Sequence, residues 1–269
     1  MKRVLLSVIF ALAASAIGSA QSFTYYFPQV ASGDGWRTTI FISNAMASAP
    51  ASGVIAVVKS DGTPFFANWI DETGTNVTLG SDVIAFTLGP GQSKKYITLG
   101  DQALTVGYAR VTANGSVLGT AMFSQLDGAG NILAEAGVPM GIPLGKQAVF
   151  VDTSLGFRTG VAIANPNSNV LEVHLELLDN NGTLIAATIR NLGPFQHIAL
   201  FTDELFPGAP AMVGRLQFWC TNPMTAIGLR FDPSGALFTT LPPIAIAGLI
   251  QPAVRWEIPG IVRRERLLS

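Results

Sequence analysis

The sequence predicts an all-β chain made of two tandem two-sheet sandwich domains behind an N-terminal export signal. Three observations predict this class: short strand-like runs bounded by turn residues, one ordered set of motifs that occurs twice, and no long amphipathic helical pattern after residue 20. The 269 residues are 49% hydrophobic and 12% charged, so the chain can bury a large core and is not expected to be disordered.

The first 20 residues have the pattern of a secretory signal peptide. A basic pair, Lys2 and Arg3, precedes an apolar run, and the small residues Gly18 and Ala20 follow it. This order predicts a signal peptide over residues 1–20 with cleavage after Ala20. The apolar run is shorter than the roughly 20 residues that span a bilayer, so we expect a secreted or cell-surface protein without a stable membrane span.

Two units with the same order of motifs follow the signal. The matched blocks are Gly35-Trp36-Arg37-Thr38 with Gly156-Phe157-Arg158-Thr159, Ile42-Ser43-Asn44 with Ile163-Ala164-Asn165, Asp61-Gly62-Thr63 with Asn181-Gly182-Thr183, Leu88-Gly89-Pro90-Gly91-Gln92 with Leu192-Gly193-Pro194-Phe195-Gln196, and Asp127-Gly128-Ala129-Gly130 with Asp232-Pro233-Ser234-Gly235. We therefore predict one domain over residues 23–144, a second over residues 146–243, and a C-terminal tail over residues 244–269. The tail is expected to form a final strand or a docking segment.

Each unit shows short runs of β-branched and aromatic residues between Gly, Pro, Asn or Asp. The runs of the first unit predict strands at Trp36–Ser43, Val54–Lys59, Val83–Leu88, Lys95–Leu99, Tyr108–Thr112 and Leu118–Leu126. In the second unit the apolar Val173, Leu175 and Leu177 alternate with His174 and Glu176, as in a sheet with one buried face. About seven or eight strands per unit of roughly 100 residues indicate a sandwich of immunoglobulin-like type.

One helical turn is expected in the second unit. Thr202 can cap it, the acidic Asp203 and Glu204 favour a helix N-terminus, and Pro207 ends it.

Several short sequence motifs of the second unit occur together in a known group of proteins. They are Gly193-Pro194, Thr202-Asp203-Glu204-Leu205-Phe206-Pro207, Gly214-Arg215-Leu216, Ala226-Ile227-Gly228-Leu229-Arg230-Phe231 and Phe238-Thr239-Thr240-Leu241-Pro242. With them the unit resembles a widespread group of uncharacterised secreted bacterial immunoglobulin-like β-sandwich repeats. The first unit is similar to a sister version through Phe27-Pro28, Gly35-Trp36, Asn44 and Glu135-Ala136-Gly137-Val138-Pro139. The resemblance covers nearly all of residues 23–243, and it implies two tandem extracellular modules with no catalytic activity to transfer.

The composition argues against several function classes. Lys and Arg number 16 against 17 Asp and Glu, so the chain lacks the basic surface that nucleic acid requires. A single cysteine, Cys220, rules out an internal disulfide and a thiolate zinc site. The two histidines, His174 and His197, are expected to be solvated or locally hydrogen-bonded, and we expect no metal and no cofactor.

Carboxylates give only weak indications of chemistry. A glycosidase needs two facing carboxylates, and the pair Asp71 and Glu72, the pair Asp203 and Glu204, and Asp152 are the candidates. Loop solvation and helix capping explain them equally well. A calcium site at the segment Asp127-Gly128-Ala129-Gly130-Asn131 is a weaker prediction than a hairpin turn, because the alternating acidic ligands are missing.

An insertion of the first unit provides the candidate binding surface. Trp69, flanked by Asn68 and Asp71, lies in a segment without a counterpart in the second unit, and an exposed ring on a loop is typical of sugar recognition. The same segment also fits a further strand, in which case Trp69 serves packing. Trp36 and Phe157 occupy matched positions, which favours packing roles for both.

The sequence as a whole predicts a non-catalytic secreted or cell-surface module for adhesion, matrix structure or protein contact. Its expected partners are extracellular proteins or polysaccharides. The alternative is a carbohydrate-binding protein that uses the Trp69 loop, and a polysaccharide hydrolase is a less favoured reading. Self-association through open sheet edges is also compatible with a sandwich.

Overall fold

The computed structural model describes residues 22–77 and 82–246. The fold is all-β as predicted. Strands account for 62% of it and form antiparallel sheets, and helices account for 3%. The predicted signal peptide and most of the predicted tail lie outside the described residues. Among the described residues, no helix has the length and apolar character needed to cross a membrane.

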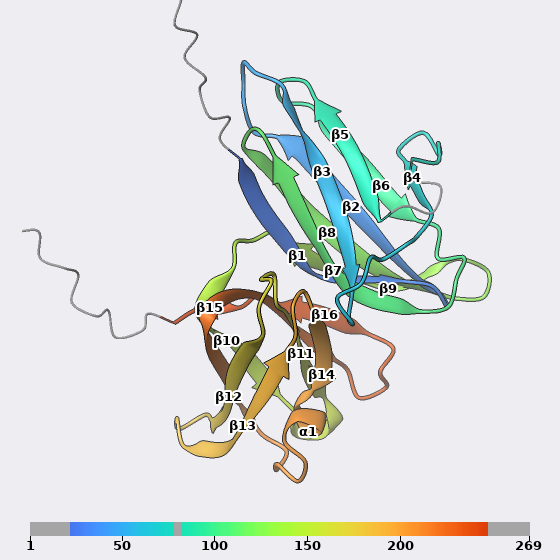
Figure 1. The fold of residues 1–269 in the computed structure, drawn as a ribbon. Coiled ribbons are helices and arrows are strands. Elements are labelled where there is room, and N and C mark those ends of the chain that lie inside the picture. Colours follow the sequence, from blue (N-terminus) through green and yellow to red (C-terminus); the bar gives the residue numbers. More distant parts are fainter. Residues whose placement is uncertain (1–21, 78–81, 247–269) are drawn as a thin grey trace, which may run out of the picture.

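The strands up to Pro139 form two facing sheets (Figure 1). They are β1 (Phe23–Ser32), β2 (Trp36–Asn44), β3 (Ala51–Lys59), β4 (Trp69–Asp71), β5 (Val83–Leu88), β6 (Ser93–Thr98), β7 (Thr105–Ala113), β8 (Val117–Leu126) and β9 (Ile132–Pro139). One sheet has the order β1-β7-β3-β5 and the other β4-β6-β2-β8-β9. Residues of both sheets share one buried core, so the two sheets pack face to face.

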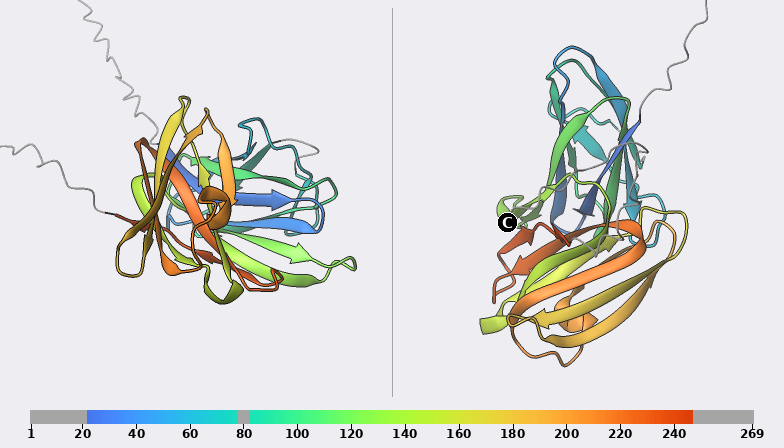
Figure 2. Two further views of the ribbon diagram at one scale, coloured as in Figure 1. Left: turned by 90° about the horizontal axis from the view of Figure 1, so that it is seen from below. Right: turned by 90° about the vertical axis from the view of Figure 1, so that its left-hand side faces the viewer.

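The later strands form a second set below the first in Figure 1, and the views in Figure 2 show that the two sets adjoin each other. They are β10 (Leu144–Asp152), β11 (Arg158–Ala164), β12 (Leu171–Asp179), β13 (Leu184–Leu192), β14 (His197–Phe201), β15 (Val213–Phe231), β16 (Phe238–Leu241) and β17 (Ile244–Ala245). The order β13-β12-β15-β10-β17 forms one layer, and β11 pairs with β14 and β15. The long β15 pairs with β10 and β12 through its first half and with β11 and β16 through its second half, so it joins both layers.

The strands follow the predicted alternation of side chains. Val173, Leu175 and Leu177 of β12 are buried in the second core, whereas His174 and Glu176 on the other face are partly exposed. The predicted strands of the first unit agree with the observed ones to within three residues at each end. At the start of the predicted tail, β17 pairs with β10, so this part of the tail is a strand.

An asparagine at the end of a strand fixes the same loop in both sets of strands. Asn44 ends β2 and Asn165 follows β11, and both side chains are buried. Each Nδ2 donates to three carbonyl oxygens: those of Ala49, Leu88 and Gly89 for Asn44, and those of Asn169, Leu192 and Gly193 for Asn165. The matched motifs of the sequence therefore make matched hydrogen bonds.

Two matched glycines mark close contacts between neighbouring strands. A Cβ at Gly107 would lie 1.9 Å from the carbonyl oxygen of Val58, and one at Gly214 would lie 2.1 Å from that of Leu178. Both distances are far below van der Waals contact, so only glycine fits at these two positions of β7 and β15.

The predicted helical turn is present as α1 (Thr202–Leu205), and a 3₁₀ turn, η1 (Ser154–Gly156), follows β10. The predicted capping by Thr202 is wrong. The N-cap residue is Phe201, and the Thr202 hydroxyl donates instead to the carbonyl of Thr159 at 2.6 Å. The Glu204 carboxylate accepts the Phe201 N–H at 2.7 Å, so the acidic first turn has the stabilising role expected of it.

Candidate binding sites

The side chain of Trp69 is not exposed on a loop. It begins β4, which pairs with β6, and its side chain is 0% exposed within the core of the first set of strands. The prediction of an exposed Trp69 is therefore wrong, and the alternative reading of this segment as a strand is correct. The ring packs inward because the pairing of Trp69 with Thr98 places it on the core face of the sheet.

The polar neighbours of Trp69 maintain the local chain. The Asn68 amide donates to the Asp101 carboxylate at 2.9 Å. Oδ1 of Asp71 accepts the Thr73 hydroxyl at 2.6 Å and the Thr73 N–H at 2.9 Å, and the hydrogen bond from the hydroxyl lowers the pKa of Asp71. Asn68, Trp69 and Asp71 therefore do not form a common binding surface around an exposed ring.

Glu72 accepts the backbone N–H of Lys95 in β6 at 3.4 Å, and the other candidate carboxylates are bound to turns or to arginine. Asp152 accepts hydrogen bonds from Ser154, which lower its pKa, and from the Arg230 guanidinium at 2.6 Å. Asp203 accepts from the Arg158 guanidinium at 3.0 Å. A glycosidase acid needs a raised pKa, so Asp152 in particular lacks the protonation behaviour of a general acid.

The glycine-rich segment after β8 is a turn, as the sequence favoured. Asp127 Oδ1 accepts the backbone N–H of Ala129 at 2.9 Å and that of Asn131 at 2.8 Å. Within residues 22–77 and 82–246, no cluster of three or more His, Cys, Asp or Glu side chains could hold a metal ion. Cys220 is half-buried, its thiol donates to the Asn222 carbonyl, and burial raises its pKa to about 11.

The two histidines have different environments. His174 lies on the outer face of β12, where its ring stacks on Trp219 at 5.3 Å between centroids and its Nε2 is 3.1 Å from Glu172. His197 is buried where the two sets of strands meet. Its Nδ1 is 3.0 Å from the Ser60 hydroxyl, and its ring stacks on Tyr108 at 6.4 Å. The expectation of a solvated or locally bonded ring therefore fits His174 and fails for His197, whose partners come from the other set.

Burial lowers the pKa of His197 to about 4, and the nearby Pro28 carbonyl opposes this shift. In the unfolded chain the ring titrates near its ordinary pKa of about 6.5, so stability is complete above pH 6.5 and falls as the pH drops toward 4. We expect a loss of about 2 kcal/mol between pH 7 and pH 5, measured by urea unfolding of the full chain.

The matched controls for this pH effect are His197→Gln and His174→Gln. Because a glutamine side chain cannot take up a proton, the first variant should lose most of the slope between pH 7 and pH 5, while the second should keep it. An unchanged slope in His197→Gln would mean that another group causes the pH dependence.

Aromatic rings from both sets of strands meet at the same junction. Phe238 of β16 stacks on Phe123 at 5.1 Å with an interplanar angle of 6°, and it also contacts Trp36 at 5.3 Å and Phe231 at 5.4 Å. The hydroxyl of Thr240 donates to the carbonyl of Gly137 beside them. Trp36 thus has the packing role that its sequence position favoured.

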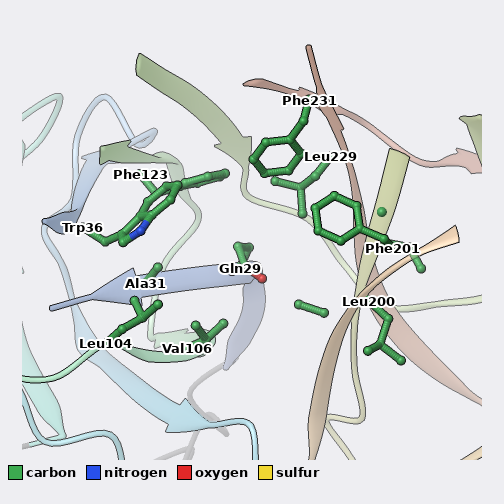
Figure 3. A pocket seen from close by; sticks show the side chains of 13 residues that line it. Gln29, Ala31, Trp36, Leu104, Val106, Phe123, Leu200, Phe201, Leu229 and Phe231 are labelled. Atoms are coloured by element: carbon green, nitrogen blue, oxygen red, sulfur yellow. The ribbon is translucent and has the colours of Figure 1, made fainter. Parts of the chain in front are cut away.

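A cavity of about 300 Å³ lies beside these rings (Figure 3). The first set of strands contributes Gln29, Ala31, Trp36, Leu104, Val106 and Phe123 to its walls. The second set contributes Leu200, Phe201, Leu229 and Phe231, together with smaller residues of β11 and β14. Sequence reasoning missed this cavity because its walls combine segments that are far apart in the chain, and no local motif marks them.

A second feature without a local motif is the open edge at β13. This strand ends its sheet and pairs only with β12 among the described strands. Of its nine residues only Leu192 is buried, and Leu184, Ile185 and Ile189 are 54%, 36% and 49% exposed. Unpaired backbone groups and exposed aliphatic side chains therefore lie along one strand.

Comparisons with models of known protein families, with curated proteins and with solved structures find no match for this chain.

Proposed function

We propose that the chain is a non-catalytic secreted or cell-surface module of two tandem immunoglobulin-like sandwiches, which contacts other proteins through the edge strand β13. The observation on which this rests is the edge itself, a nine-residue strand with one buried residue and three exposed aliphatic ones. An open edge of this kind pairs readily with a further strand, because its N–H and C=O groups have no partner on one side.

The tandem organisation is supported by the matched loop hydrogen bonds of Asn44 and Asn165 and by the matched glycines Gly107 and Gly214. These features occur at equivalent places of the repeated motifs, so two copies of one structural unit explain them more simply than two unrelated sheets. The immunoglobulin-like type rests on the number of strands and on the resemblance described above. Export rests on the signal pattern of residues 1–20.

A contact role also fits what surrounds β13. Shallow grooves border the strand, one shared with the end of α1 and the segment 206–210 after it, and the other with His174 and Trp219 of the neighbouring strands. A partner strand added at β13 could place alternate side chains in these grooves, which is how strand addition gains specificity. By contrast, Asp71, Asp152, Asp203 and Glu204 are already bound to turns or to arginine, and Glu72 accepts the backbone N–H of Lys95 in β6.

The proposal is tested with a double substitution on the exposed positions of β13, Ile185→Lys with Ile189→Lys. Lysine on an edge strand opposes pairing with another strand. We expect the unmodified chain to bind a defined protein of the source organism's envelope saturably, and the double variant to bind it at least about tenfold more weakly.

The matched control is Leu118→Lys, which changes an aliphatic residue that is 61% exposed on β8. It should bind as the unmodified chain does. Equal binding by the double variant, or the lack of any saturable protein partner, would overturn the proposal. Turnover of a polysaccharide that a single carboxylate substitution abolishes would overturn the non-catalytic part of it.

A further inference from the structure

We propose that the cavity between the two sets of strands binds a small, neutral, largely apolar molecule that donates one hydrogen bond to Gln29. This inference is independent of the β13 edge and adds a ligand site to the proposed contact function. It rests on the size of the cavity, the chemistry of its walls and the position of one buried amide.

The volume suits a compact ring system. At about 300 Å³ the cavity reaches the lower end of the range for ligand pockets in proteins. It is about twice the size of a 150 Å³ cavity that accommodates benzene. A fused bicyclic ring therefore fits with space for a short substituent.

The walls select an uncharged molecule. Among the described residues that line the cavity none is charged, and the polar side-chain groups are the Gln29 amide and the indole N–H of Trp36. An ion would lose its hydration without gaining a counter-charge, which is costly in an apolar site. The rings of Trp36, Phe201 and Phe231 border the same space and favour a flat aromatic ligand (Figure 3).

Gln29 supplies the polar contact. Its side chain is 7% exposed, and its Oε1 is buried without a hydrogen-bond partner. A buried acceptor without a donor costs about 1 to 3 kcal/mol. Less than 1 Å² of the Oε1 surface is accessible, so the amide has to rotate toward the cavity to accept a ligand N–H or O–H, and that hydrogen bond removes the penalty. Figure 3 shows the amide between the residues of the two sets of strands.

The local backbone explains why an amide is aimed at this cavity. The register of β1 against β7 shifts between Phe27 and Val30, so one extra residue is inserted in β1. A bulge of this kind turns a side chain away from the direction that the regular strand would give it. Gln29 lies within the bulge and lines the cavity.

The test uses two probes of the same shape, indole, which has one N–H donor, and benzothiophene, which has none. Binding to the full chain is measured by isothermal titration calorimetry. We expect one molecule per chain and about fivefold to tenfold tighter binding of indole, as one net hydrogen bond to a buried acceptor provides. Because both sets of strands line the cavity, indole should also raise the thermal midpoint.

Two variants locate the site. Gln29→Leu removes the acceptor and leaves the indole N–H without a partner, so the preference for indole over benzothiophene should disappear. Ala199→Phe adds a ring at an exposed residue of the cavity wall and should weaken both probes at least about tenfold. Ala85→Phe at an exposed position of β5, outside the cavity, should change neither.

Two results would overturn the inference. Lack of binding by either probe up to its solubility would mean that water or no molecule occupies the cavity. Indole binding that is unchanged in both Gln29→Leu and Ala199→Phe would place the ligand elsewhere on the chain. If only Gln29→Leu failed to fold, Ala199→Phe with its Ala85→Phe control would still decide the location.

Discussion

Phe238→Ala is expected to lower the free energy of unfolding by about 3 to 5 kcal/mol, the usual cost of removing a buried phenylalanine ring. Phe238 is 7% exposed, and its ring contacts Trp36 and Phe123 of the first set of strands as well as Phe231 of the second. Because this ring packs against both sets, its loss should weaken their contact in addition to the local core.

The measurement combines urea unfolding with limited proteolysis of the segment between β9 and β10. We expect Phe238→Ala to unfold at lower urea and to be cleaved faster in this segment. Leu237→Ala, which changes a neighbour that is 59% exposed, should match the unmodified chain in both assays. Unfolding of Phe238→Ala at the unmodified midpoint would show that the aromatic cluster contributes little to the junction.

The strands were predictable because alternation reports directly which face of a sheet is buried. The segment Val83–Leu88 has the predicted bounds, and β12 buries the predicted Val173, Leu175 and Leu177. Turns were predictable for a similar reason, since the Asp127 carboxylate accepts hydrogen bonds from residues of the same short segment. Local interactions determine both features, and a single sequence contains them.

Trp69 shows where local reasoning was insufficient. Its strand β4 has three residues, too few for an alternation to appear, and its inward direction depends on pairing with β6 about 25 to 30 residues later. The segment lacks a counterpart in the second unit, so the repeat gave no guide either. The sequence therefore leaves open whether this insertion is a binding loop or a further strand, and only the pairing with β6 places its tryptophan in the core.

The junction between the two sets of strands was not predictable for a different reason. His197 and Ser60 are 137 residues apart, and the cavity adds Gln29, Leu104 and Phe231 from three further strands or loops. Nothing in the local pattern of any of these residues differs from that of an ordinary strand residue. Only the orientation of one set of strands on the other brings them together.

The matched asparagines allow the second large prediction, a comparison of Asn165→Ala with Asn44→Ala. Each substitution removes the Nδ2 donor from three carbonyl oxygens, of which those of Gly89 and Gly193 keep one backbone donor. It also removes the Oδ1 that accepts the N–H of Met46 or of Asn167, and a buried unsatisfied group costs about 1 to 3 kcal/mol. We expect each variant to lose about 3 kcal/mol or more. The thermal midpoint should fall by about 6 to 12 °C, which differential scanning calorimetry measures.

The isosteric variants Asn165→Asp and Asn44→Asp serve as controls for the direction of the hydrogen bonds. Aspartate fills the same space but cannot donate to a carbonyl, so each should destabilise at least as much as alanine. Recovery of stability in either aspartate variant would contradict the role of Nδ2 as donor. Similar losses at both positions would mean that the two loops depend on the same repeated set of asparagine hydrogen bonds. A loss confined to one position would mean that the other loop is held by its remaining contacts, and that the repeated motif has lost its structural role in that copy.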